Sequence, residues 1–163
     1  MATSESTRFC ISNLMSAATI RLQLRGRDRE EVLQELIGAI PELAARPDAR
    51  VTLFKALLER EQLHSTGVGD GVALPHARQA LANVVEHPVI VLGRHPTGIA
   101  YGAIDGQPVT LFLLLVTTTV TEHLQVLARI SRLIRNPDLR QNLLTATHPQ
   151  VVLTLIRQAE EGL

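Results

Sequence analysis

His76 ends a stretch, "HSTGVGDGVALPH", whose residue types could hold a phosphoryl group. Imidazole has an ordinary pKa of about 6.5, so a neutral ring offers a nucleophilic nitrogen at neutral pH. Pro75 has a fixed φ and pushes Leu74 toward extended conformations, so the backbone sets the direction of His76. Exposed N–H groups of a glycine loop can receive phosphoryl oxygens, and a hydroxyl can add a contact. The candidate phosphate-binding residues are therefore Thr66, Gly67 and Gly69.

Other phosphate-binding patterns do not fit this loop. A dinucleotide fingerprint needs G-x-G-x-x-G between a strand and a helix, whereas these glycines follow a predicted helix and precede an apolar run. A Walker loop needs Gly-Lys-Ser/Thr, which the stretch lacks. The simple alternative is a tight connection from helix to strand, in which the glycines only supply positive φ.

The segment "LLEREQLHSTGVGDGVALPHAR" resembles the active-site segment of the IIA components of the bacterial phosphoenolpyruvate-dependent phosphotransferase system. The likeness is to the fructose/mannitol class and, within it, most closely to the nitrogen-regulatory IIA protein. It continues through "AIDGQPVTLFLLLV" and "TEHLQVLARISRLIRNPDLRQNLLTA", where His123 matches the family's second histidine. Two departures are Asp70, where Asn is frequent, and Ala77, where Gly is usual. Asp70 adds a negative charge that is expected to reduce phosphorylation.

The resemblance implies a catalytic role for three residues. His76 would accept and then donate the phosphoryl group through Nε2, and the planar fork of Arg60 would clamp phosphoryl oxygens. His123 would donate a hydrogen bond to the phosphoryl group or orient the ring of His76, from the first turn of a helix. From the residues alone, Arg60 is better explained as a cation favoured at a helix C-terminus, and His123 is equally a partly exposed helical residue.

The elements that must position these residues follow from hydrophobic periodicity. Apolar runs in "HPVIVLGR" and "PVTLFLLLV" predict strands covered on both faces, and "TIRLQL" predicts a further strand. Helices are predicted over 26–40, with Asp28 as N-cap and a capping box to Glu31, and over 48–61, 121–136, 137–146 and 149–161. The pattern predicts an α/β single-domain sandwich over 1–163, with a central mixed sheet flanked by helices on both faces. Residues 1–24 are expected to form a peripheral N-terminal segment.

Composition narrows the function classes. Lys and Arg number 16 and Asp and Glu number 16, and the three Phe, one Tyr and absent Trp offer few stacking surfaces, so nucleic-acid binding is not expected. A single cysteine indicates a reducing compartment, so a cytoplasmic location is expected. The apolar runs are too short to insert into a membrane. No metal-ligand spacing or cofactor motif occurs, so neither a metal nor a cofactor is expected.

The resemblance implies a phosphoryl carrier that receives its phosphoryl group from an HPr-like phosphocarrier protein. Val68, Val72 and Leu74 are candidates for an apolar docking patch, although they suit a core equally well. A nitrogen-type regulatory role, acting on target proteins, is favoured by the absence of IIB and IIC segments from this sequence. The alternatives are a IIA unit of a fructose/mannitol-type transport system, which would pass the group to a IIB unit, and a binding module that is no longer phosphorylated.

Overall fold

The computed structural model describes residues 10–163, which form one mixed five-stranded sheet with helices on both faces. The strands are β1 (Ile20–Arg21), β2 (Gly67–Gly69), β3 (Val72–Ala73), β4 (Val89–Ile99) and β5 (Val109–Val116). Their order across the sheet is β1-β4-β5-β3-β2. β4 and β5 pair antiparallel, whereas β1 with β4 and β3 with β5 pair parallel. The predicted mixed sheet is thus confirmed, with β5 at its centre.

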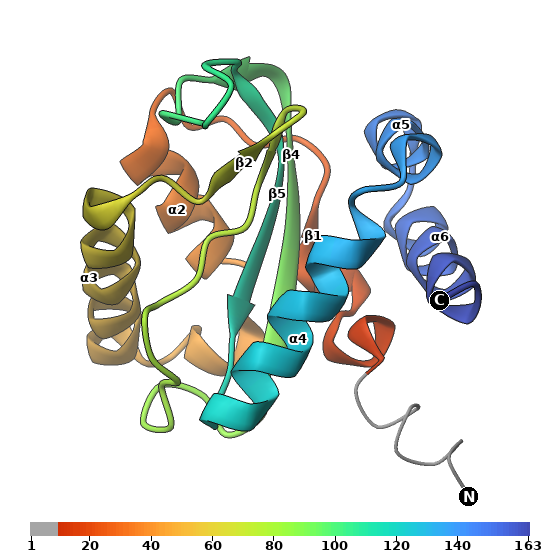
Figure 1. Cartoon of the computed structure of the whole chain (residues 1–163). Helices are drawn as coiled ribbons and strands as arrows, with labels where there is room; N and C mark the ends of the chain where they lie inside the picture. The colour runs from red at the N-terminus through yellow and green to blue at the C-terminus, as the bar shows by residue number, and fades with distance from the viewer. Residues whose placement is uncertain (1–9) are drawn as a thin grey trace, which may run out of the picture.

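Two layers of helices cover the sheet (Figure 1). One layer holds α2 (Arg29–Ile37) and α3 (Pro47–Leu63), with the 3₁₀ turn η3 (Pro41–Leu43) between them. The other holds α4 (Val120–Leu133), α5 (Pro137–Thr145) and α6 (Pro149–Glu161), together with the N-terminal 3₁₀ turns η1 (Ile11–Leu14) and η2 (Ala17–Thr19). Asp28 caps α2 as predicted, accepting a hydrogen bond from Glu31 N at 2.9 Å. The Glu31 carboxylate, however, accepts from Arg27 N rather than from the cap residue.

Each face of the sheet carries its own hydrophobic core. Alternate residues of β5 point to opposite faces, so Phe112 and Leu114 pack under α2 and α3, while Leu111 and Leu113 pack under α4 and α6. These continuous apolar strands are buried because both faces are covered. The predicted strand at 19–24 is shorter than expected, since only two residues pair with β4.

The described part of the N-terminal segment is anchored to the C-terminal helix by a buried carboxylate. Glu160 in α6 accepts hydrogen bonds from Ile11 N at 2.7 Å and Ser12 N at 2.9 Å. Arg129 of α4 lies 3.0 Å from the same carboxylate and balances its charge. Residues 10–24 therefore pack on the sheet, with Ile11 and Leu24 almost fully buried. Residues 1–9, the rest of the predicted segment, lie outside the described part.

The short segment that follows β3 runs along the edge of β5 and leads to His76. Pro75 O accepts a hydrogen bond from Leu115 N at 3.0 Å, which extends the β3–β5 pairing by one contact. Leu74 N donates to Thr66 O at 3.0 Å, so the glycine hairpin of β2 and β3 is tied to the same segment. The backbone on both sides of Pro75 is thus held by the centre of the sheet, which fixes the starting point of the His76 side chain.

Candidate functional site

His76 is half-buried, and its ring is held by its own chain. Nδ1 lies 2.6 Å from Leu74 O, which accepts hydrogen bonds but has no proton to give. Nδ1 therefore carries the ring proton, and in the neutral imidazole Nε2 keeps a free lone pair. The sequence predicted the direction of this side chain from Pro75, and the bond to Leu74 also selects the tautomer. The arrangement leaves Nε2 as the nucleophilic atom.

His123 faces His76 from the start of α4. The two ring centroids are 5.5 Å apart, and the ring planes are inclined at 54°. Thr119 caps α4 and places His123 in the first turn, as predicted, with the ring buried against Thr117. Nδ1 of His123 lies 3.0 Å from the Thr117 hydroxyl. The structure thus brings together two histidines that are far apart in sequence, each with one ring nitrogen already bonded.

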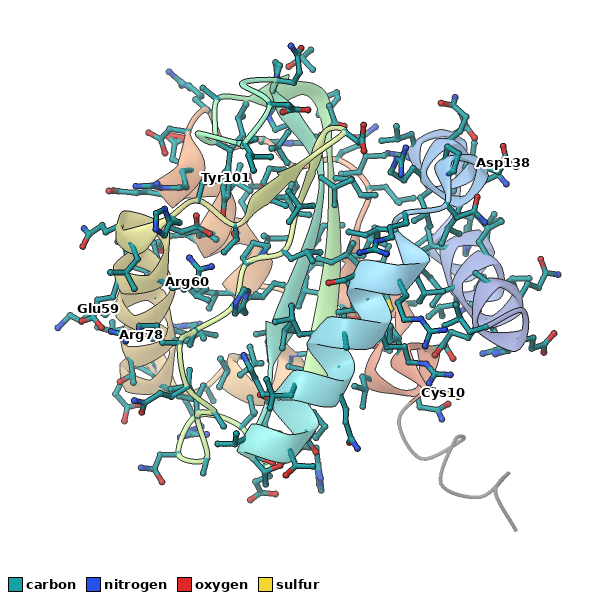
Figure 2. All side chains as sticks on the ribbon, viewed as in Figure 1. Cys10, Glu59, Arg60, Arg78, Tyr101 and Asp138 are labelled. Atoms are coloured by element: carbon teal, nitrogen blue, oxygen red, sulfur yellow. The ribbon has the colours of Figure 1, made fainter. Side chains whose placement is uncertain are left out.

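Arg60, the third candidate catalytic residue, lies on α3. Its guanidinium reaches from the helix toward the segment that follows β3 (Figure 2), and Nη1 donates to His64 O. Its positive charge acts on the His76 ring. The helix-end location that the sequence predicted is confirmed, since Arg60 lies in the last turn of α3, whereas its phosphoryl contact stays a prediction. The two interpretations are therefore compatible in one residue.

Glu61, the residue after Arg60, was not identified as a site residue from the sequence. Only 4% of its surface is exposed, and its carboxylate accepts from Thr66 N at 2.9 Å, from the Thr66 hydroxyl and from the Tyr101 hydroxyl at 2.8 Å. Tyr101 in turn packs edge-on against Phe112 (its position is labelled in Figure 2). Burial and the nearby Glu61 charge raise the pKa of Tyr101 above its ordinary value, so it remains a hydroxyl donor. The network ties α3 to the glycine hairpin.

The glycine hairpin is shaped by close contacts. A Cβ at Gly67 would come within 2.7 Å of Ala103 Cβ, and Gly69 has a φ of 99° that favours glycine. The N–H of Gly67 is already bonded to Ser65 Oγ at 3.0 Å, and the Thr66 hydroxyl proton is committed to Glu61. These contacts support the steric interpretation of the loop. Phosphate binding by Thr66, Gly67 and Gly69 stays a prediction.

Asp70 lies at the tip of the hairpin with a positive φ of 57°. Its N–H donates to Asp105 Oδ2 at 3.0 Å. The backbone N–H groups of Gln107 and Asp70, which both bond to the Asp105 carboxylate, lower the pKa of Asp105. The Asp70 carboxylate is exposed and lies 3.9 Å from Arg140 Nη2 in α5. The charged side chains that act on His76 are instead Arg60 and Glu61. The expected effect of Asp70 on phosphorylation is therefore long-range at most.

The predicted docking patch is divided between surface and core. Val68 is 50% exposed, whereas Val72 and Leu74 are buried, so those two residues belong to the core. Other exposed apolar side chains lie on the neighbouring elements: Ile104, whose N–H bonds to Gly67 O, and Val120 and Leu124, which flank His123 on α4. Val120 is 68% exposed and Leu124 is 61% exposed. Exposed apolar side chains thus lie on the glycine hairpin, on Ile104 beside it and around His123 on α4.

Two features of the described residues bear on other classes of function. Among residues 10–163, no cluster of three or more His, Cys, Asp or Glu side chains has a metal-binding arrangement. Within the same range, no helix is long and apolar enough to cross a membrane.

Of the remaining histidines, His95 is buried, with Nε2 2.9 Å from Gly26 O and Nδ1 accepting from Gly98 N at 3.0 Å, so it holds the bend in β4.

The lowered pKa values of His76 and His123 predict that the folded state becomes less stable in acid. Desolvation lowers the pKa of His76 below its ordinary 6.5, and Arg60 adds to this, although the bond to Leu74 and the charge of Glu61 oppose it. Desolvation, followed by the charge of His76, likewise lowers the pKa of His123. Between the folded and unfolded pKa values the unfolded chain binds more protons, so the folded state is most favoured above pH 6.5 and loses stability below it. We expect the free energy of unfolding, measured with urea, to fall between about pH 7 and pH 5.

The control for this pH dependence is a pair of substitutions. His76→Gln removes a titrating group from the site and should flatten the slope, whereas His87→Gln changes an exposed histidine and should leave it unchanged. Equal slopes for the wild type and His76→Gln would show that the proton uptake occurs elsewhere.

The fold is that of the IIA proteins of the phosphotransferase system. Nitrogen regulatory protein IIA-Ntr from Neisseria meningitidis superimposes with a TM-score of 0.80 at 26% identity, covering 90% of this chain and 98% of that one. Residues 13–159 match the family model for the phosphoenolpyruvate-dependent sugar phosphotransferase system, EIIA 2. The chain belongs to this EIIA family, so the resemblance found in the sequence is confirmed.

Curated relatives come from two branches of the family. A nitrogen regulatory protein from Bradyrhizobium diazoefficiens is 32% identical over 148 residues, which cover 90% of this chain and 94% of that protein. The fructose-specific EIIABC component of Bacillus subtilis is also 32% identical, over 153 residues that cover 93% of this chain but only 24% of that larger protein. The family membership is therefore clear, while identity alone does not separate the two branches.

Proposed function

We propose that the protein is a histidine phosphocarrier that accepts a phosphoryl group on Nε2 of His76. The observation that carries the proposal is the bond from Nδ1 to Leu74 O, because it leaves Nε2 unprotonated opposite His123. The lowered pKa of His76 keeps the ring neutral, and hence nucleophilic, at neutral pH. Phosphoryl transfer needs little covalent help beyond such positioning and charge stabilisation.

The transfer step is a displacement at phosphorus. Nε2 of His76 attacks the phosphorus of the donor's phosphohistidine, and a new N–P bond forms while the donor's N–P bond breaks. The electron pair of the broken bond returns to the donor's imidazole nitrogen, and the proton on Nδ1 of His76 stays in place. The phosphorylated ring is then formally cationic, so the acceptor Leu74 O and the Glu61 carboxylate stabilise it.

Arg60 and His123 stabilise the transferred group. One guanidinium nitrogen of Arg60 is bonded to His64 O, which anchors the side chain while its other N–H groups remain available to phosphoryl oxygens. When the Thr117 hydroxyl donates to Nδ1 of His123, Nε2 of that ring carries a proton and can donate to a phosphoryl oxygen. Donors held in advance cost little reorganisation when charge develops on the transferring group.

The donor in this proposal is an HPr-like phosphocarrier protein in the cytoplasm, and the main role is nitrogen-type regulation of target proteins. The coverage of nearly the whole Neisseria IIA-Ntr chain supports this role. The second candidate is a IIA unit of fructose-type transport, which the similarity to the EIIABC component supports. A IIB unit would then be the acceptor, and rapid transfer from the phosphorylated protein to a fructose-type IIB domain would favour transport.

The test is phosphorylation of the full chain with phosphoenolpyruvate, enzyme I and an HPr-type donor. We expect intact-protein mass spectrometry to show one phosphoryl adduct that is lost in acid, as phosphohistidine is. Two-dimensional ¹H–¹⁵N spectra of the histidine rings should place the phosphorus on Nε2, with the proton retained on Nδ1. An adduct on Nδ1 would overturn the assignment of the nucleophilic nitrogen, and no adduct with competent donors would leave the non-phosphorylated binding module as the better description.

A further inference from the structure

A cavity of about 440 Å³ lies beside the glycine hairpin, and neither His76 nor His123 lines it. Its walls come from β2 and β3 on one side and from the end of α4 and the start of α5 on the other, and Figure 1 shows the hairpin and α5 at the same end of the molecule. Val72, Leu74 and Ile134 form an apolar floor, each almost fully buried. The volume is within the range of pockets that hold small molecules, about 300–1,000 Å³.

The polar part of this cavity is mainly cationic. Arg135 and Arg140 both line it, and the one acidic lining residue, Asp70, has an exposed carboxylate that is 3.9 Å from Arg140 Nη2. Nη1 of Arg140 is fixed by a 2.7 Å bond to Ile134 O, so its guanidinium is held at the cavity, while Nη2 lies 3.9 Å from the exposed Asp70 carboxylate. Ser131 also lines the cavity, but its hydroxyl proton is donated to Leu127 O. The two arginines are thus the available donors.

The N-terminus of α5 does not supply this positive charge. Asn136 caps the helix, and its side chain accepts from Asp138 N at 2.9 Å and Leu139 N at 3.3 Å. The first free amides of the helix are therefore satisfied within the chain. Any anion in the cavity must be bound by the arginine side chains, whose planar forks suit carboxylates.

We propose that this cavity binds a small organic anion, a carboxylate carried on a short apolar body. The carboxylate would pair with Arg140 and Arg135, displacing the loose contact with Asp70, and the apolar body would cover the floor formed by Val72, Leu74 and Ile134. A mostly apolar lining with a small number of placed polar or charged groups is the usual composition of a small-molecule site.

Leu74 connects this cavity to His76. Its side chain lines the cavity, while its carbonyl oxygen accepts the hydrogen bond that sets the His76 tautomer. An occupant that presses on the Leu74 side chain therefore acts on the residue that orients the phosphoryl acceptor. On the proposed phosphocarrier function, the anion would modulate phosphoryl acceptance, but its binding itself does not depend on that function.

The binding test uses 4-methylpentanoate as the probe and its neutral counterpart, 4-methylpentanamide, as the matched control. In ¹H–¹³C and ¹H–¹⁵N spectra of the full chain, we expect saturable shifts of the Leu74 methyls and of the His76 ring with the carboxylate. The amide should bind at least about ten-fold more weakly, since it lacks the charge that pairs with the arginines. Equal binding of the two probes, or no saturable shift with the carboxylate, would overturn the proposal.

Variants of the arginines locate the site. Arg140→Gln and Arg135→Gln should each weaken carboxylate binding about ten-fold or more, whereas Arg132→Gln, an exposed residue of α4 outside the cavity, should leave it unchanged. Arg135 is exposed and its replacement does not threaten the fold, so it tests the proposal even if Arg140→Gln disturbs the bond to Ile134. Unchanged affinity in Arg135→Gln and Arg140→Gln would contradict it. Phosphorylation of the wild type with and without the probe then tests the link to His76 separately.

Discussion

His76→Ala is expected to abolish phosphoryl acceptance, because Nε2 of His76 is the nucleophile in the proposed reaction. His123 does not replace it in the proposed mechanism, because Nδ1 of that ring is bonded to the Thr117 hydroxyl and its Nε2 carries the proton. Intact-protein mass spectrometry after incubation with phosphoenolpyruvate, enzyme I and the HPr-type donor should show no adduct in the variant. The expected effect is complete loss rather than a slower rate, since the variant lacks the atom that forms the N–P bond.

The matched control for this experiment is His87→Ala, which removes an exposed histidine outside the site and should be phosphorylated like the wild type. Thermal unfolding of both variants checks the fold, and we expect small changes because His76 is only half-buried and His87 is exposed. An adduct of undiminished yield on His76→Ala would show that another residue is the acceptor.

Glu61→Ala should cause the largest loss of stability among single substitutions at the site. It removes a buried carboxylate that accepts from Thr66 N and from the hydroxyls of Thr66 and Tyr101, and so leaves buried donors without a partner. An unsatisfied buried polar group costs about 1–3 kcal/mol, so we expect a loss of about 3 kcal/mol or more in the free energy of unfolding. Urea denaturation, followed by circular dichroism, measures it.

Two further variants separate the buried network from a general effect on α3. Glu59→Ala changes an exposed carboxylate of the same helix and should alter stability by no more than about 0.5 kcal/mol. Tyr101→Phe removes one donor and leaves the ring, so an intermediate loss of about 1–2 kcal/mol is expected. A loss in Glu61→Ala no larger than that in Glu59→Ala would mean that the network does not stabilise the hairpin.

The Glu61 network also marks the limit of prediction from the sequence. "RE" before the glycine loop identified Arg60 through the family pattern, but a glutamate in the last turn of a polar helix is ordinarily solvated. Its burial depends on Tyr101, which the β4–β5 connection brings to α3 from a distant part of the sequence. No local pattern encodes such a contact, because it arises only when the two layers pack together.

The docking candidates illustrate the same limit. Val68, Val72 and Leu74 are all apolar and close in sequence, and the alternation of a strand does not indicate which face becomes covered. Only the parallel pairing of β3 with β5 buries Val72 and Leu74, whereas Val68 on the edge strand β2 stays half exposed. Whether a strand lies at the edge or the centre of a sheet depends on the topology, and hence on all the strands together.

The sequence by itself determined the mixed α/β architecture, the helix that carries His123 in its first turn, and the stiff backbone before His76. These features depend on local chemistry: apolar periodicity, capping residues, and the fixed φ of Pro75. Only the tertiary structure decided that His123 faces His76 at 5.5 Å between ring centroids, that Leu74 O selects the tautomer, and that Glu61 is buried. The reason is physical, since the positions of these groups follow from the packing of layers that the chain reaches only when it folds.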